Sequence, residues 1–576
     1  MKRGAWWCRF CLLGGVVCLL LAGVLLALRA GVAARVGQAL APRVAFAEAL
    51  VARTQTFHLI PDNSAALAAS HFAQAQTARA ATNLAYAQIE LEKALAFGEL
   101  ALNRRGADTY AGVALLREYY ADYIDVLLQR NQQEPDGVFA KRAWEAHDRL
   151  RWLLSPRPAE AANAVNRTLT VAEVQQELLD DQSLLLEYAL GEKQSYLWAI
   201  TKIGFACFPL PPRAEIEAKA ARLVELAGQQ PEQMADDPNV EFERLAGELS
   251  AVLLQPVAAQ MELRRVWVVP EGVLQQVPFS ALPVPAQSLE NDERLASTPL
   301  LVRHEVLSLP AAATGVWLRQ QHQAPAQREA VERSIAVIAD PVFGKYDERV
   351  RSAPAVETPT PANLSAQVLE NMLTRLRGFE FGKGVTVPDE RAFARLPAAH
   401  TEAAAIAAIA PHSAQWLDFA ASREVVLSDE LARHPLLHFA THGVSDSRSP
   451  AGSGLFLSQV NAQGQAVNGF VSNQEISQLH LASELVVLSA CETAVSSAQA
   501  GKEAARDSVA HSFLRAGAHR VVASLWKVND AATAELMKVF YQGMFEHKLR
   551  PAAALRAAQV ALAKDKRWQA PYYWAA

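Results

Sequence analysis

Residues 436–443 read LLHFATHG and residues 484–494 read ELVVLSACETA, and the expected architecture of the chain rests on these two stretches. Each contains a short apolar run typical of a buried strand. The first run leads into His442 and Gly443, and the second leads into Cys491. Open α/β sheets gather reactive groups at the carboxyl ends of their strands. The two stretches therefore predict a histidine and a cysteine at one edge of a parallel sheet.

Other strand-like runs surround these two and extend the predicted sheet. They are RRVWVVP at 264–270, SIAVIAD at 334–340 and HRVVASL at 519–525, with helical patterns between most of them. Strands that alternate with helices are typical of an α/β fold with a largely parallel sheet and flanking helices, which we expect over residues 260–576. HRVVASL leads toward Asp530, so a carboxylate is also expected near the histidine and the cysteine.

The sequence before residue 260 is mostly helical. Apolar residues recur at helical spacing through residues 64–155, which predicts three or more antiparallel helices. A plain helical bundle and a degenerate tetratricopeptide-like array fit equally well, because no clear repeat of about 34 residues is present. SLLLEYAL at 183–190 and QSYLWAI at 194–200 predict a β-hairpin. We expect an all-α helical-hairpin region over 60–160 and a hairpin-and-helix connector over 161–259.

The N-terminal stretch FCLLGGVVCLLLAGVLLAL at 10–28 has 19 residues without a charge. As a helix, it is long enough to cross most of the hydrocarbon core of a membrane. We therefore expect residues 1–35 to hold a single-pass transmembrane anchor. A cleaved signal peptide, followed by export of the mature protein, is the alternative. Basic residues on both sides of the run leave the orientation open.

Composition limits the classes of partner and cofactor. The formal net charge is -5, so the chain lacks the basic excess that binding to nucleic-acid phosphates requires, and no nucleic-acid partner is expected. Three of the five cysteines lie in or beside the N-terminal apolar run. No CxxC is paired with a second CxxC or with an HxxxH in the spacing of a zinc site. We expect neither a metal site nor a disulfide framework.

A histidine and a cysteine at neighbouring strand ends favour thiol catalysis. A free thiol with a pKa of about 8.5 is mostly protonated at neutral pH, and an imidazole such as that of His442 can accept its proton. The backbone N–H groups of Gly443 and Cys491 are candidates for an oxyanion hole. Taken singly, a strand-end cysteine or histidine is more often a packing residue. The separation of 49 residues (491 minus 442) is close to the spacing of about 50 in caspases.

These stretches belong to a longer pattern that includes RRVWVVPEGVLQQVPFSAL at 264–282, SFLRAGAHRVVASLWKVNDAATAELMKVFYQGM at 512–544 and PYYWAA at 571–576. Over about 300 residues the chain resembles the CHAT domain, a family of caspase-like proteins often attached to tetratricopeptide repeats. The resemblance implies that His442 in FATHG is the catalytic histidine and that Cys491 in SACET is the nucleophile. It also implies peptide-bond hydrolysis through a thioester, with no metal or organic cofactor.

Asp530 corresponds to the acidic position in the W-x-V-x-D segment of the family. A carboxylate there is suited to bind a basic P1 side chain of the substrate, which favours cleavage after Arg or Lys. The alternative, equally favoured by the sequence, is that Asp530 caps the helix that begins near Ala531. The segment SSAQAGKEAARDS at 496–508 lacks the Gly-Glu-Gly that is usual in the family, so the substrate pocket is expected to differ in shape.

The sequence as a whole predicts a membrane-tethered, caspase-like cysteine endopeptidase that acts on a protein or peptide substrate. Many caspase-like domains work only after a partner rearranges their active-site loops, so the N-terminal helices are a candidate binding site for an activating protein. A catalytically silent CHAT-domain scaffold is the chief alternative. An acyltransferase that uses the same thiol ranks third.

Overall fold

A computed structural model describes most of the chain beyond residue 62. The described residues are 63–105, 110–155, 168–231, 238–263, 265–285, 298–323, 334–350, 395–410, 412–444, 452–489 and 508–576. The predicted membrane anchor lies outside them. Among the helices within these ranges, none combines the length and the apolar character needed to cross a membrane.

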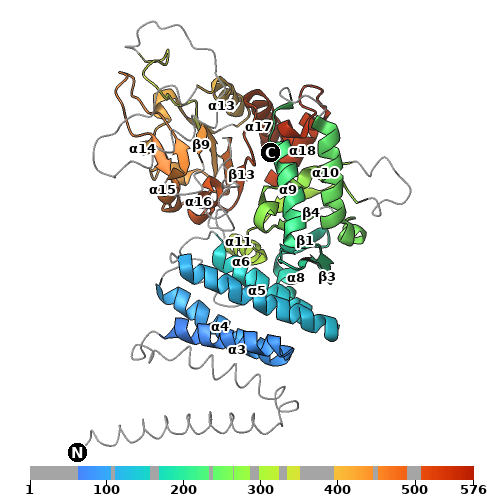
Figure 1. Cartoon of the computed structure of the whole chain (residues 1–576). Coiled ribbons are helices and arrows are strands. Elements are labelled where there is room, and N and C mark those ends of the chain that lie inside the picture. Colours follow the sequence, from blue (N-terminus) through green and yellow to red (C-terminus); the bar gives the residue numbers. More distant parts are fainter. Residues whose placement is uncertain are drawn as a thin grey trace, which may run out of the picture.

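The described chain begins with a stack of four helices (Figure 1). They are α3 (Ser64–Ala80), α4 (Leu84–Arg105), α5 (Tyr110–Gln133) and α6 (Val138–Leu154). Consecutive helices pack against each other through one continuous apolar core that includes Leu91, Leu127 and Trp144. The predicted helical region is therefore confirmed.

The first of two five-stranded sheets follows the helical stack; we call it the first sheet. Its strands are β1 (Ser183–Ala189), β2 (Ser195–Thr201), β3 (Phe205–Leu210), β4 (Arg265–Val269) and β5 (Glu305–Ser308), in the order β3-β2-β1-β4-β5. The antiparallel pair β1 and β2 confirms the predicted hairpin. β3 lies after the hairpin, in the part of the 161–259 connector that was predicted to be helical. β1 pairs in parallel with β4, so the sheet extends across the expected boundary at residue 260.

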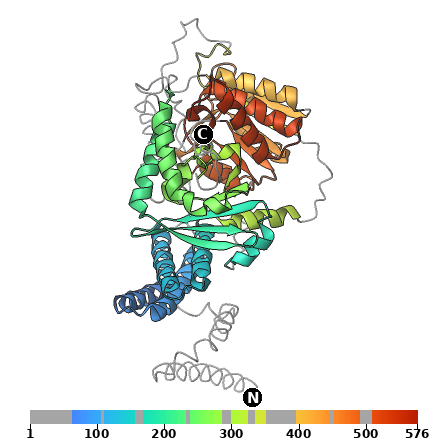
Figure 2. The ribbon, with the colours of Figure 1, turned by 90° about the vertical axis from the view of Figure 1, so that its right-hand side faces the viewer.

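Helices cover both faces of the first sheet, because side chains alternate along β1. Leu184 and Leu186 pack on one side with α9 (Arg213–Ala227) and α10 (Pro238–Leu253). Leu185 packs on the opposite side, toward the helical stack. Two more helices, α8 (Val171–Glu177) and α11 (Ala312–Gln323), contribute to that second side. Figure 2 shows the resulting position of the sheet between the helical stack and the remaining chain.

Short 3-10 helices lie between the other elements of this part of the chain. η3 (Gln255–Gln260) precedes β4, and η4 (Gly272–Gln276), η5 (Phe279–Ala281) and η8 (Leu300–Val302) lie between β4 and β5.

The second sheet contains the strands predicted to carry the chemistry. Its strands are β6 (Ile335–Ala339), β7 (Ser413–Leu417), β8 (Leu436–Ala440), β12 (Leu485–Leu488) and β13 (Val521–Ala523), in the order β13-β12-β8-β6-β7. Every neighbouring pair is parallel. A small antiparallel sheet of β9 (His442–Val444), β10 (Gly454–Phe456) and β11 (Phe470–Ser472) follows β8. The predicted α/β class with a parallel sheet is confirmed.

Helices also cover both faces of the second sheet. On one side lie α13 (Pro397–Ile409) and α17 (Asp530–Phe545), with α18 (Pro551–Lys564) and α19 (Pro571–Trp574) packed beyond them. On the other side lie α14 (Arg423–Val426), α15 (Asn473–Ser477) and α16 (Val509–Arg515). One apolar core joins the first side to α9 and α10 of the first sheet. The two sheets therefore share a core through α17 and α18.

Candidate active site

His442 lies directly beyond the carboxyl end of β8. β8 is fully buried, and after Thr441 the chain enters β9, where His442 is paired with Phe456 of β10. The Thr441 hydroxyl donates a hydrogen bond to the carbonyl of Phe456. The ring of Phe343 packs against the His442 ring, with 4.9 Å between the ring centroids. These contacts hold a half-buried imidazole at the edge of the second sheet.

Cys491 lies outside the described residues, so its predicted contact with His442 is not placed. The chain is described up to Ser489, two residues earlier in the sequence. Ser489 follows β12, and its backbone N–H donates a hydrogen bond to the carbonyl of Phe439 in β8 (2.8 Å). β12 and β8 are direct neighbours. The chain therefore reaches Ser489 one strand away from the strand that leads into His442.

Gly443, the predicted oxyanion-hole residue, lies in β9 opposite Leu455 of β10. Gly443 therefore lies in a regular β-strand, directly after His442. Its role in an oxyanion hole, together with the backbone N–H of Cys491, stays a prediction.

Asp530 is the first residue of α17, and its side chain is exposed at the surface. The side chain of Asn529 caps this helix by accepting a hydrogen bond from the N–H of Ala532 (3.0 Å). The alternative that Asp530 is the cap is therefore wrong. Surrounding protein raises the pKa of Asp530 through desolvation, and the charge of Glu402 raises it further, whereas Lys527 opposes the shift. Asp530 thus remains available for a ligand.

A small pocket lies at the carboxyl ends of β8 and β12, against the first turns of α13 and α17. Its lining residues are Leu396, Ala398, Ala399, Glu402, Thr441, Ser489, Val528, Asp530 and Thr533. Thr441 precedes His442, and Ser489 comes two residues before Cys491. The pocket therefore borders the positions from which both predicted catalytic residues extend, and Asp530 is part of its wall.

Glu402, the second acidic residue of the small pocket, was not among the residues predicted from the sequence. Glu402 belongs to α13 and is only 4% exposed. It accepts a hydrogen bond from the Ser489 hydroxyl (3.1 Å), and His438 Nε2 lies 3.0 Å from its other oxygen. In α13, the buried residues Ala399, Glu402, Ala403 and Ile406 share one face. The sequence therefore shows an acidic residue on an otherwise apolar helix face, and this pattern could have identified Glu402 as a buried acid.

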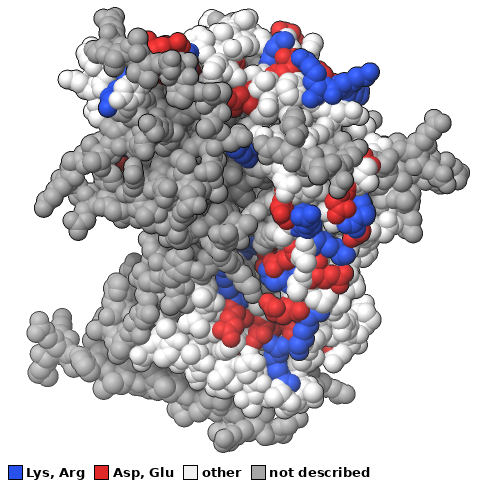
Figure 3. Space-filling model, turned by 45° about the horizontal axis from the view of Figure 1, so that its top comes forward, with Lys and Arg blue, Asp and Glu red and all other residues white. Residues whose placement is uncertain are grey.

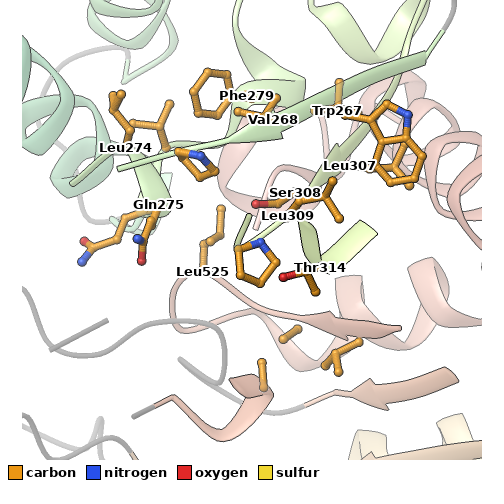
Figure 4. Close-up of a pocket in the computed structure, with 18 of the residues that line it drawn as sticks. Trp267, Val268, Leu274, Gln275, Phe279, Leu307, Ser308, Leu309, Thr314 and Leu525 are labelled. Atoms are coloured by element: carbon orange, nitrogen blue, oxygen red, sulfur yellow. The ribbon is translucent and has the colours of Figure 1, made fainter. Parts of the chain in front are cut away.

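A larger cleft adjoins the small pocket. Its volume is about 2790 Å³, several times the roughly 300 to 1,000 Å³ of small-molecule sites. Figure 4 shows Val268, Leu307 and Leu309 of the first sheet's end facing Leu525, which follows β13. The cleft and the small pocket share Ser489, Val528 and Thr533 among their lining residues.

A buried set of charges, which we call the ion cluster, lies at the carboxyl end of the first sheet. Its members are His147, Glu187, Arg213 and Glu271. The Glu187 carboxylate in β1 accepts a hydrogen bond from Trp144 Nε1 (2.7 Å) and lies 2.6 Å from His147 Nδ1. Glu271 accepts hydrogen bonds from the N–H of Leu190 (2.6 Å) and from Arg213 (3.0 Å).

The ion cluster shifts the pKa values of its own members. Burial lowers the pKa of His147, but the hydrogen bonds and charges of Glu187 and Glu271 outweigh burial and raise it to about 9. Burial raises the pKa of Glu271, but His147, Arg213 and the N–H of Leu190 lower it to about 2. Opposite charges within hydrogen-bonding distance each favour the ionised partner. The cluster therefore joins α6 to the first sheet electrostatically.

A third group of charges, at the carboxyl end of β6, consists of Asp340, Asp418 and His400. Arg349 lies 3.1 Å from Asp340 and 2.6 Å from Asp418, and Arg395 lies 2.9 Å from Asp340. Two arginines thus pair with the carboxylates, which favours a salt-bridge network over a cation site.

The described surface carries no single sign of charge on the face that Figure 3 draws. Basic and acidic side chains are intermixed there.

Comparison with known protein families gives one result. A profile of the CHAT domain matches residues 243–576, which is more than half of the chain. The match begins within α10 and continues through the strands of the second sheet. A search of curated proteins found no match.

Proposed function

The chain belongs to the CHAT domain family, and on this premise we propose that it is a caspase-like cysteine endopeptidase with His442 and Cys491 as its catalytic dyad. One observation supports the proposal most strongly. β8 and β12, the strands that lead into His442 and Cys491, are nearest neighbours, with Leu488 opposite Phe439. Parallel neighbours direct the residues that follow them to the same edge of the sheet.

The proposed reaction uses the two side chains in sequence. His442 accepts the thiol proton of Cys491, and the thiolate attacks the scissile carbonyl carbon. Backbone N–H groups of Gly443 and Cys491 stabilise the oxyanion. The C–N bond then breaks as His442 returns the proton to the leaving amine, which leaves a thioester. Water, deprotonated by His442, hydrolyses the thioester and restores the thiol.

The rim of the small pocket is proposed to bind the P1 side chain of the substrate, since the pocket itself, at about 20 Å³, holds no more than about one water molecule. It lies between Thr441 and Ser489, beside both catalytic positions, and Asp530 contributes a carboxylate at its surface. A carboxylate pairs best with a cationic side chain, so we expect cleavage after Arg or Lys. The adjoining cleft has room for further residues of the substrate.

The N-terminal part is proposed to tether and to regulate the peptidase. Residues 10–28 would hold the protein at a membrane, and the helical stack would bind an activating protein. Arg151 of α6 supports a route for such regulation, because it donates hydrogen bonds to the carbonyls of Pro270 (2.7 Å) and Pro310 (3.1 Å). Both prolines line the large cleft. A partner that moves α6 would therefore move the wall of that cleft.

The side of the membrane that carries the peptidase can be tested by protease protection in intact cells. Externally added protease would digest the peptidase domain only if it faces the outside.

The direct test is hydrolysis of a peptide library by the full-length chain, alone and with proteins captured through the helical stack. We expect cleavage after basic residues and a loss of kcat/KM of about a thousandfold or more in Cys491→Ala and His442→Ala. Cys207→Ala is the matched control and should keep its activity, because burial raises the pKa of the Cys207 thiol to about 12. Absence of cleavage under every condition would instead support the scaffold.

A further inference from the structure

Two open sheet edges line the large cleft. β5 is the outermost strand of the first sheet, and β13 is the outermost strand of the second. All residues of both strands are among the lining residues of the cleft. Figure 4 shows Leu307 and Ser308 of β5 above Leu525, which follows β13. Among the described residues, neither edge has a further strand paired with it.

The backbone of β13 turns some of its hydrogen-bonding groups away from the sheet. In a strand, the N–H and C=O of one residue point to the same side, and successive residues alternate. The N–H of Val486 in β12 donates to the carbonyl of Arg520 (2.9 Å), so the backbone of Arg520 faces β12. The backbone groups of Val521 and Ala523 therefore face outward, on the open edge.

The same alternation applies to β5. The N–H of Leu309, directly after this strand, donates to the carbonyl of Val268 in β4 (2.8 Å). The backbone groups of Val306 and Ser308 therefore face away from β4, and neither residue has a backbone hydrogen bond to a described residue outside its sheet. Free N–H and C=O groups on an edge strand are a template for pairing with another extended chain.

The lining of the cleft also carries an excess of positive charge. Between residues 265 and 576, seven lysines and arginines line it against three acidic residues. Among the lining residues before 265, five cationic side chains are balanced by five acidic ones. The positive excess therefore belongs to the part of the cleft that the two open edges border.

Three of these cationic residues, Arg319, Arg520 and Arg550, form what we call the arginine group. Arg520 directly precedes β13, and Arg550 Nη2 lies 3.5 Å from Glu305, the first residue of β5. Desolvation by surrounding protein lowers the pKa of Arg319 and of Arg520, one nearby acid opposes each shift, and the charge of Arg550 lowers both further. Among the described residues, neither Arg319 nor Arg520 forms an ion pair with a carboxylate. Both guanidinium groups are thus open to an anionic ligand.

We propose that the cleft between the two sheets is a docking groove for an extended, acidic segment of a partner protein. The backbone of the segment pairs with the outward groups of the open edges, as in strand addition. Its carboxylates pair with the arginine group, because a guanidinium binds a carboxylate through two parallel hydrogen bonds. Leu536 and Met537 of α17 and Leu555 of α18 also line the cleft and provide apolar contacts for the side chains between the acids.

The position of the arginine group favours a partner segment over the scissile part of a substrate. β8, β12 and β13 are parallel, so their amino ends lie at one edge of the second sheet and their carboxyl ends at the other. Arg520 lies at the amino end of β13, whereas His442 follows the carboxyl end of β8. The groove therefore binds its acidic ligand at the opposite end of the strands from the proposed catalytic residues, and binding does not depend on turnover.

The test uses the full-length Cys491→Ala protein and a fluorescein-labelled peptide of alternating glutamate and valine, with Kd measured by fluorescence anisotropy. Methylation of alternate backbone nitrogens in the peptide should raise Kd at least about tenfold, because it removes the N–H donors that pair with the open edge. A peptide with lysine in place of glutamate should also bind at least about tenfold more weakly. No binding of the acidic peptide, or equal affinity for either of the other two, would overturn the proposal.

Variants of the arginine group test the charged contacts. Arg319→Gln and Arg520→Gln should each raise Kd for the acidic peptide by about 10- to 100-fold, the range for a hydrogen bond to a charged group. Arg244→Gln, which changes an exposed arginine of α10 that is not among the lining residues, is the matched control and should leave Kd unchanged. An unchanged Kd in both cleft variants, or the same loss in the control, would contradict the role of the arginine group.

Two further results would assign the groove to a different occupant and thereby overturn the proposal. Cleavage of the acidic peptide by the wild type would make the segment a substrate. A dimer in sedimentation velocity that the peptide dissociates would mean that a second copy of the chain pairs with the open edges. If the wild type cuts no peptide at all but Cys491→Ala binds the acidic peptide as described, the peptidase proposal fails and the docking groove survives.

Discussion

The two five-stranded sheets place similar polar groups at their carboxyl ends but satisfy them differently. At the first sheet, the ion cluster pairs each charge with another, and Trp144 and Leu190 add hydrogen bonds. At the second sheet, Glu402 has one oxygen without a hydrogen bond from described residues, and Asp530 faces the surface. The same residue types are therefore paired with one another at the first strand end, whereas Asp530 at the second stays exposed. A substitution should cost stability at the first and specificity at the second.

The largest effect on stability is expected from Glu187→Ala in the ion cluster. The substitution leaves the indole N–H of Trp144 without its partner and leaves His147 with only Glu271, 3.7 Å away. Breaking a buried charge pair costs about 3 to 5 kcal/mol. Urea denaturation would measure the change in the free energy of unfolding. Glu225→Ala removes an exposed acid paired with Arg222 and should cost less than about 1 kcal/mol. Equal losses in the two variants would mean that the ion cluster is not the stabilising unit described above.

A pH dependence of about 3 kcal/mol is expected from the same cluster. The folded state raises the pKa of His147 from its ordinary value of about 6.5 to about 9. Its contribution is fully present below about pH 6.5 and is lost as the pH rises through about 9. Denaturation between pH 6 and 10 would therefore show a steeper fall in the wild type than in His147→Gln. Parallel profiles would show that His147 does not titrate in this way.

The smallest effect on stability is expected at the second sheet, from Asp530→Asn. The folded state raises the pKa of Asp530, so ionisation of this residue opposes folding as the pH rises through that pKa. Removing the charge should stabilise the protein by less than about 1 kcal/mol at pH 7, because the side chain is exposed. The same variant should lose its preference for a basic P1 residue. A clear loss of stability with specificity intact would reverse the contrast between the two strand ends.

The sequence predicted the second sheet well because its signals are local. Apolar runs end in His442, Ser489 and the loop before Asp530, and short runs between helices indicate parallel strands. β3 was missed because FACFPL at 205–210 contains Pro209 and forms an edge strand, where neither periodicity nor strand propensity is strong. The extension of the first sheet across residue 260 was also hidden, since only pairing between β1 and β4 reveals it.

The candidate site was only partly predictable, because some of its contacts join residues that are far apart in the sequence. His442, Gly443 and Asp530 follow strands and are visible from their position in the sequence. Glu402 lies on a helix far from them in the sequence, and its role depends on contacts with Ser489 and His438 that form only in three dimensions. The ion cluster likewise joins α6 to β1 across 40 residues. Its one local signal is a histidine close to a tryptophan on the buried face of α6.

The central claim, that His442 activates Cys491 as a nucleophile, can be tested most directly by mapping a covalent label. The full-length protein would be treated with a peptidyl acyloxymethyl ketone with P1 Arg, and the modified residue identified by mass spectrometry. We predict modification of Cys491 that disappears in His442→Ala, whereas Cys207 stays unmodified because burial raises its pKa to about 12. Modification of Cys491 that persists unchanged in His442→Ala, or a label on Cys207 in its place, would contradict the account.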